Sequence, residues 1–207
     1  ERALDVLLAQ IGPDGAVVEE SARQYQTLLS TWALYQLASP SPAAAAARQL
    51  SLAWLRSEFD AHLENGTDWA AATGILALGV LTLIDANEAQ EGQPGDAELI
   101  GRLLERMASQ CKLESGSLGR SLAHNDRIRA SERATIVILW APWTLLATYR
   151  AERSSLALTA QARERARELG QASSAVVLAG VDEVGQESDF IVSEWLFCVS
   201  QFLHEAH

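Results

Sequence analysis

The densest group of side chains that could carry out chemistry lies in residues 122–133, LAHNDRIRASER. His124 and Asp126 could transfer a proton. Arg127 and Arg129 could hold an anion, because they precede an apolar helix whose N-terminus carries a partial positive charge. The alternative is a solvated loop in which these charges neutralise one another. His124 and both arginines are therefore candidate ligand-binding residues, and Asp126 is a candidate catalytic acid.

Three further carboxylates lie close to the starts of other apolar helices. Asp68 could act as an acid, or it could cap the helix that follows it. Glu187 precedes the last apolar helix, where a neighbouring serine or aspartate is the alternative cap. Glu194 lies on that helix itself, and a carboxylate in so apolar a sequence needs a partner. We expect Glu194 to face the centre of the fold, and we include all three among the candidate catalytic residues.

The chain has six tryptophans, and most of them fall on apolar segments. Trp69, Trp140 and Trp143 are candidate ligand-binding residues, because aromatic rings that line a cavity suit an isoprenoid chain, a carbocation or stacked sugar rings. The alternative is that these rings simply pack in the core.

The segment Ala134 to Tyr149 carries no charge. A helix that is apolar on every side must be surrounded by protein or by lipid. Because it is shorter than the roughly 20 residues needed to cross a bilayer, we interpret it as the buried inner helix of a soluble, all-α domain.

An amphipathic helix is followed by an almost wholly apolar helix three times along the chain. The pairs are 43–63 with 68–86, 96–111 with 131–150, and 155–169 with 189–205, and two shorter helices at 1–10 and 22–38 precede them. Amphipathic members belong outside and apolar members inside. These eight helices predict a single all-α domain over residues 1–207, arranged as an α/α toroid, a partial (α/α) barrel or an α-solenoid.

Several details of this arrangement are also predicted. Gly170 is expected to end its helix, which leaves a long loop over residues 171–188, and Arg48 and Arg56 are expected to face water. Long loops at 11–21, 112–130 and 171–188 would all emerge where inner helices begin, so we expect any ligand site at that end.

The composition limits the classes of molecule that the protein is expected to bind. The net charge of −11 makes nucleic acid an unsuitable partner. The two cysteines lie far apart in apolar patterns, which indicates buried free thiols. We find no metal-binding spacing and predict neither a metal nor another cofactor. No signal-like segment is seen at the start of the sequence, so the cytoplasm is the expected location.

The first third of the chain resembles the repeats of class II terpene cyclases. Residues 2–15 resemble their helix and the turn after it, with Val17 where an aromatic residue is usual, and residues 25–34 resemble the inner helix that follows. The segment 65–68 lies where these enzymes carry their Asp-rich motif and retains only Asp68. The resemblance implies an α/α toroid that binds an isoprenoid or similar apolar ligand in a central cavity.

The later part is similar to the (α/α)6 barrel of glucoamylase-type glycoside hydrolases. Residues 89–97 resemble one of its connections, and residues 135–146 and 187–195 resemble two inner helices. By position Glu64 falls near that family's general acid, but the motif around that acid is missing. This resemblance implies a glycan ligand. A third possibility is a non-catalytic helical-repeat module that binds a protein or a small apolar ligand, so the sequence leaves open whether the protein is an enzyme.

Overall fold

The computed structural model describes residues 2–18, 23–65, 73–111, 130–184 and 189–207. These ranges contain eight α-helices and, apart from an isolated bridge between Ile11 and Val17, no β-structure. The all-α class is therefore confirmed. The helices are α1 (Arg2–Ala9), α2 (Arg23–Tyr35), α3 (Pro42–Asn65), α4 (Thr73–Glu88), α5 (Asp96–Cys111), α7 (Ala130–Arg153), α8 (Ala160–Val184) and α9 (Asp189–Ala206).

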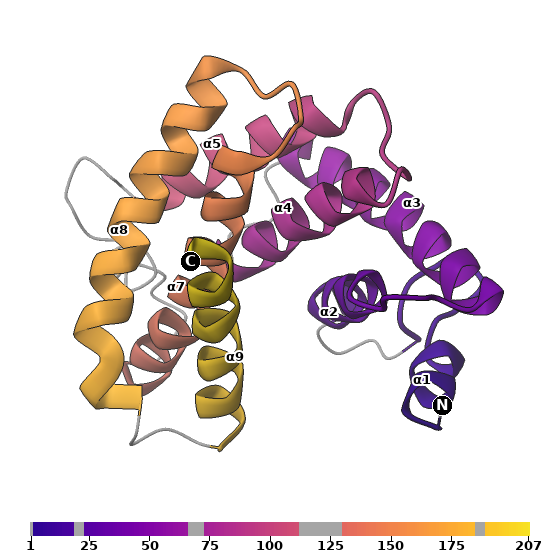
Figure 1. Cartoon of the computed structure of the whole chain (residues 1–207), viewed down its shortest axis with the longest axis horizontal. Coiled ribbons are helices and arrows are strands. Elements are labelled where there is room, and N and C mark those ends of the chain that lie inside the picture. Colours follow the sequence, from indigo (N-terminus) through magenta and orange to yellow (C-terminus); the bar gives the residue numbers. More distant parts are fainter. Residues whose placement is uncertain (1, 19–22, 66–72, 112–129, 185–188) are drawn as a thin grey trace.

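The helices form two layers in the order that the sequence pattern predicts. The inner helices follow one another through space, with α2 against α4, α4 against α7, and α7 against α9 (Figure 1). The outer helices α3, α5 and α8 pack on their inner neighbours and on one another. This layered arc is compatible with an α/α toroid, and the toroid itself stays a prediction.

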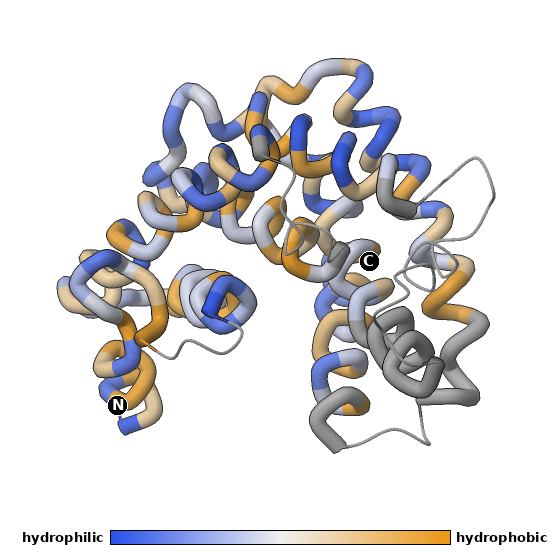
Figure 2. Tube along the Cα trace, turned by 180° about the vertical axis from the view of Figure 1, so that it is seen from behind, coloured by the Kyte–Doolittle hydropathy of each residue, from blue (hydrophilic) through white to orange (hydrophobic). Residues whose placement is uncertain are grey.

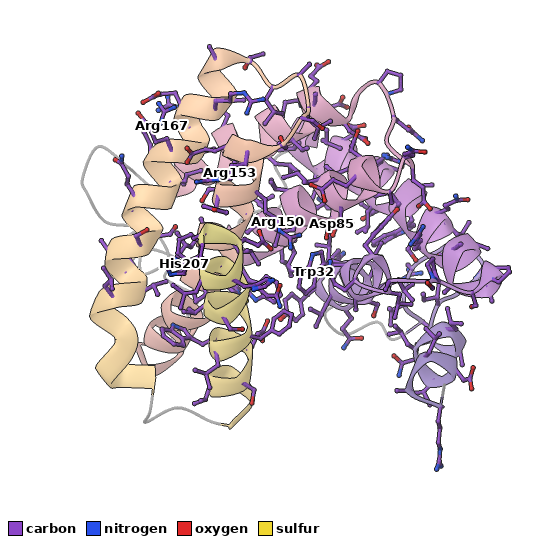
Figure 3. The ribbon with its side chains drawn as sticks, viewed as in Figure 1. Trp32, Asp85, Arg150, Arg153, Arg167 and His207 are labelled. Atoms are coloured by element: carbon purple, nitrogen blue, oxygen red, sulfur yellow. The ribbon has the colours of Figure 1, made fainter. Side chains whose placement is uncertain are left out.

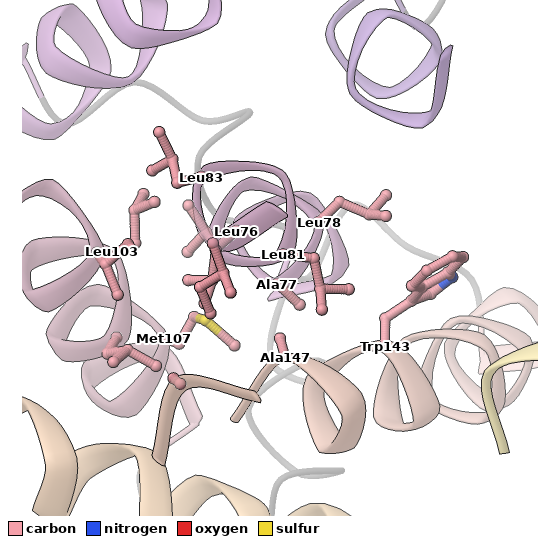
Figure 4. Close-up of a cluster of buried hydrophobic side chains, with 14 of the residues drawn as sticks. Leu76, Ala77, Leu78, Leu81, Leu83, Leu103, Met107, Trp143 and Ala147 are labelled. Carbon is pink, nitrogen blue, oxygen red and sulfur yellow. The ribbon is translucent and has the colours of Figure 1, made fainter. Parts of the chain in front are cut away.

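The core is centred on α4, the most completely buried helix. Leu76, Leu78 and Leu81 are almost wholly removed from solvent. Figure 4 shows this helix between Leu103 and Met107 of α5 on one side and α7 on the other. Burial of each such leucine contributes about 1.5–3 kcal/mol, so the apolar sequence of α4 explains why it becomes the hub of both layers.

The turn between α1 and α2 forms where Gly12-Pro13-Asp14-Gly15 predicts it. The amide of Gly12 donates to the carbonyl of Ala16 at 2.7 Å. Gly15 has a φ of 90°, and a Cβ at this position would lie 2.4 Å from the carbonyl oxygen of Leu50 on α3. Glycine is therefore required here both by the backbone conformation and by the close approach of α3.

Two predictions about α8 are wrong. Helix α8 does not end at Gly170 but continues to Val184, so most of the loop expected at 171–188 is helical. The reason is packing: a Cβ at Gly170 would lie 3.1 Å from Oγ1 of Thr148 on α7. Gly170 thus lets two helices approach closely instead of ending one of them, and Val177 continues the buried face beyond it.

The prediction that Arg48 and Arg56 face water is also wrong. Arg48 pairs with Glu91 at 2.5 Å, and its guanidinium lies 4.8 Å from the ring centroid of Tyr35. Arg56 pairs with Asp96 at 2.7 Å, in a contact where both side chains are largely buried. These two arginines fasten the connection between α4 and α5 onto α3, because both acids lie in or next to that connection.

No helix in the described ranges combines the length and the apolar character that a bilayer span requires. The trace in Figure 2 accordingly alternates between hydrophilic and hydrophobic stretches.

Candidate functional site

Glu194 joins three inner helices through one of its oxygens. Its Oε1 accepts a hydrogen bond from the hydroxyl of Tyr25 on α2 at 2.6 Å and another from Nε1 of Trp143 on α7 at 2.7 Å. Burial, and then the hydrogen bond to Glu194, raise the pKa of Tyr25 above its usual value. Tyr25 therefore remains a neutral donor throughout the physiological pH range. The sequence prediction that Glu194 faces inward and needs a partner is confirmed.

Aromatic rings surround this carboxylate. The rings of Trp32 and Trp143 meet edge to face with centroids 5.1 Å apart, and Phe197 lies 5.6 Å from Trp32. These geometries are favourable for aromatic pairs. We refer to Tyr25, Trp32, Trp143 and Phe197 as the aromatic cluster. Figure 3 shows Trp32 between α2 and α9, so the cluster links the two ends of the inner layer.

Two buried polar atoms, one in the aromatic cluster and one on Glu194 beside it, have no hydrogen-bond partner among the described residues. They are Oε2 of Glu194, which is an acceptor, and Nε1 of Trp32, which is a donor. Buried polar groups in folded proteins are nearly always paired, and leaving one unpaired costs about 1–3 kcal/mol. An acceptor and a donor in one apolar cluster are complementary to a hydroxyl group.

Cys198, one turn after Glu194, is fully buried. Its pKa is raised mainly by burial and secondly by the charge of Glu194. The prediction of a buried free thiol is confirmed for this residue, whereas the side chain of Cys111 lies outside the described part. Since the thiolate is the reactive form, Cys198 is unsuited to act as a nucleophile.

A second polar assembly lies at the C-terminal ends of the inner helices. Asp85 of α4 accepts hydrogen bonds from Nη1 of Arg150 at 2.7 Å and from Nε2 of Gln36 at 2.6 Å. Arg150 also pairs with Glu205 of α9 at 2.5 Å. Burial outweighs the attraction of Arg150 and raises the pKa of Asp85 to about 6. This network ties α4, α7 and α9 to the end of α2.

A pocket of about 490 Å³ opens beside this network. The guanidinium of Arg153 lies 3.8 Å from the centroid of the Tyr149 ring, and Figure 3 shows Arg150 and Arg153 in the same region. We call this cavity the polar pocket. Its lining residues are mostly charged or hydroxylated: Glu88, Tyr149, Arg150, Arg153, Ser154, Ser155 and Glu205.

Of the candidates predicted from sequence, Glu194 and Trp143 come into direct contact. Trp140 instead packs on α4, where a Cβ at Gly74 would come within 2.3 Å of its ring. The remaining candidates lie outside the described residues, and their roles stay predictions: Asp68, Trp69, His124, Asp126, Arg127, Arg129 and Glu187. Of the long loops expected at the N-terminal ends of the inner helices, only the one at 112–130 lies almost wholly outside the described residues. The polar pocket lies at the opposite ends of these helices.

Sequence reasoning overlooked Asp85 and Arg150, although a signal was present. Asp85 is the only charged residue between Thr73 and Asn87. Arg150 directly follows the uncharged run that forms most of α7. The argument applied to Glu194, that a lone charge in an apolar helix needs a partner, applies equally to both.

Among the described residues, no cluster of histidine, cysteine or carboxylate side chains could hold a metal ion. Comparisons with protein family models, with curated proteins and with solved structures gave no match to the chain.

Proposed function

We propose that this protein binds an apolar, isoprenoid-like ligand that carries a hydroxyl group, with the ligand held at the aromatic cluster and Glu194 as its polar anchor. The observation that carries this proposal is a pair of buried atoms at one site, Glu194 Oε2 and Trp32 Nε1, that have no hydrogen-bond partner in the described part of the chain. The proposal concerns binding, and no catalytic step is part of it.

A hydroxyl group is the simplest ligand group that carries both the donor and the acceptor that these two atoms need. Its O–H can donate to Oε2 of Glu194, while its oxygen accepts from Nε1 of Trp32. Oε1 of Glu194 already accepts two donors, so Oε2 is the oxygen left for a ligand. The faces and edges of the rings suit the hydrocarbon body of the ligand. Ligand sites of this kind are mostly apolar with a few polar groups that fix orientation.

A sugar fits the aromatic cluster less well, because each of its several hydroxyls would need a polar partner. A carboxylate that only joined helices in a scaffold or a protein-binding surface would have no need to leave one buried oxygen without a partner among the described residues, as Glu194 does. The aromatic cluster therefore favours an apolar ligand over the glycan and over the purely structural alternatives.

The proposed route to the aromatic cluster lies between α2 and α9. These two helices are linked by side chains, through the hydrogen bond of Tyr25 to Glu194 and the ring contact of Trp32 with Phe197. Trp32 is 4% exposed, whereas Phe197 is 41% exposed. Phe197 thus covers the cluster from outside, and its displacement would admit a ligand without breaking a backbone hydrogen bond.

The test compares an isoprenoid alcohol with a matching hydrocarbon. Farnesol and farnesene are titrated into the protein while tryptophan fluorescence is recorded, with the wild type and Trp32→Phe in parallel. This substitution keeps an aromatic ring and removes the N–H. Loss of one hydrogen bond costs about 1 kcal/mol, so we expect farnesol to bind about fivefold more weakly and farnesene to be unaffected.

Trp54→Phe is the matched control, because Trp54 lies on the outer helix α3 near Arg23. It should change neither affinity. Absence of saturable farnesol binding, or an equal effect of Trp32→Phe on alcohol and hydrocarbon, would refute the proposed function.

A further inference from the structure

We infer that the polar pocket is a second ligand site, separate from the aromatic cluster, and that it binds a small zwitterion whose carboxylate meets Arg153 and whose ammonium meets Glu88. No residue lining this pocket belongs to the aromatic cluster. The residues Glu194 and Glu205 are eleven positions apart on α9, which is about 16 Å along a helix. The inference therefore stands independently of the proposed isoprenoid site.

Two charged residues of the polar pocket, Arg150 and Glu205, are already held in ion pairs. Arg150 donates to Asp85 through Nη1 and to Glu205 through Nε and Nη2. These charge-assisted bonds have distances between 2.5 and 3.0 Å. A ligand that captured Arg150 would leave Asp85, which is 7% exposed, without its counter-ion. Arg150 and Glu205 are thus structural parts of the wall.

Two charged groups of the wall remain available. Arg153 is stacked on Tyr149, and no carboxylate of the described residues lies within ion-pair distance of it. Likewise, Glu88 has no cation of the described residues within that distance, and both side chains are exposed. Stacking leaves the N–H groups at the edge of the guanidinium free to bind a carboxylate with two parallel hydrogen bonds.

The loop that follows α7 supplies two hydroxyl groups beside Arg153. Arg163 holds this loop in place: its Nη1 donates to the carbonyl of Glu152 at 2.7 Å, and its Nη2 donates to that of Leu156 at 2.8 Å. Ser154 and Ser155 lie between these two anchored positions and line the pocket. The hydroxyl of Ser154 already donates to the carbonyl of Ala151 at 3.0 Å. A carboxylate bound at Arg153 would therefore find one donor next to it, the hydroxyl of Ser155, which lines the pocket.

The charge balance of the wall decides the class of ligand. Two arginines and two glutamates line a volume of about 490 Å³, a size typical of small-molecule sites. A simple anion at Arg153 would be repelled by Glu88 and Glu205, and a simple cation at Glu88 would be repelled by the arginines. A ligand that carries both charges matches both available groups at once.

The test uses L-glutamine, whose side chain is neutral, and two derivatives that each lack one charge. L-glutaminamide lacks the carboxylate, and N-acetyl-L-glutamine lacks the ammonium. Isothermal titration calorimetry on the whole chain at neutral pH should give at least tenfold tighter binding of L-glutamine than of either derivative.

Two variants then assign each charge. Arg153→Gln should abolish the advantage of L-glutamine over L-glutaminamide, and Glu88→Gln should abolish its advantage over N-acetyl-L-glutamine. Arg102→Gln is the matched control, because Arg102 is a similarly exposed arginine that pairs with Asp60 on the outer layer. Circular-dichroism melting should show that all three variants fold, because none of these side chains is buried.

Equal affinity for the three probes, absence of measurable L-glutamine binding, or an effect of Arg102→Gln as large as that of Arg153→Gln would overturn the inference. Displacement of bound L-glutamine by maltotriose would also overturn it, since it would show that the polar pocket recognises hydroxyl groups and not paired charges.

Discussion

Replacing Asp85 by asparagine should change how the stability of the protein depends on pH. Asp85 has an ordinary pKa of 3.8 that burial raises to about 6 in the folded state, in spite of the neighbouring Arg150. Between these values the folded chain holds a proton at Asp85 that the unfolded chain has lost. The free energy of unfolding must therefore fall as the pH rises through this window.

The size of this effect follows from the two pKa values. Their difference corresponds to about 3 kcal/mol of stability lost when Asp85 ionises completely, at about 1.4 kcal/mol per pH unit. About half of this loss, roughly 1.4 kcal/mol, falls between about pH 5 and about pH 7.5. Asparagine has nearly the same shape as the neutral acid and does not titrate. The Asp85→Asn variant should gain this amount relative to the wild type over that range.

The assay is urea unfolding followed by circular dichroism at several pH values across the range. A constant offset between the two proteins, from the altered bonds to Gln36 and Arg150, does not depend on pH and drops out of the comparison. Asp60→Asn is the matched control, because Asp60 is an exposed acid paired with Arg102. Parallel curves for the wild type and Asp85→Asn, or a variant that loses stability relative to the wild type as the pH rises, would refute the reasoning.

Two further predictions concern packing. Gly79→Ala should lower the free energy of unfolding by about 1–3 kcal/mol, because the new Cβ would lie 2.4 Å from Cζ of Phe59. Gly95→Ala is the control for urea unfolding, since a Cβ added there would have no neighbouring atom within 4 Å. An equal loss of stability in both variants would contradict the packing argument. In a Cys111→Ser background, Cys198 should resist Ellman's reagent in the native protein and react fully in denaturant, because it is 0% exposed and its pKa is raised. Rapid reaction of the native protein would show that α9 does not bury this thiol.

The sequence predicted those features of the fold that depend on one helix at a time. The uncharged run from Ala134 to Tyr149 predicted a buried helix, and residues 141–148 of this run are buried. The end of α8 was missed, because a glycine that commonly terminates a helix here serves the contact with Thr148. The environment of Arg48 was missed for a similar reason: its partner, Glu91, is 43 positions away in the chain. Both errors arose where a contact between helices overrode a local preference.

At the candidate site, too, the sequence predicted a single residue but not its contacts with other helices. Glu194 could be identified because a carboxylate in an apolar helix needs a partner. Its partners could not, since Tyr25 lies 169 positions away and reaches Glu194 only because α2 and α9 face each other. The rotation of each helix about its own axis decides which side chains meet, and a periodic apolar pattern leaves that rotation undetermined when a helix is apolar on every side.

Asp85 and Glu194 are both carboxylates in apolar helices, but their hydrogen-bond partners differ. Asp85 has both oxygens occupied, one by the charged Arg150 and one by Gln36, so it holds helices together and offers nothing to a ligand. Within the described residues, Glu194 receives only neutral donors, both on the same oxygen, and its other oxygen has no partner beside the aromatic rings. A carboxylate that served only to join helices would be expected to use both oxygens, as Asp85 does. The difference between these two residues is therefore the strongest reason to look for a ligand at Glu194.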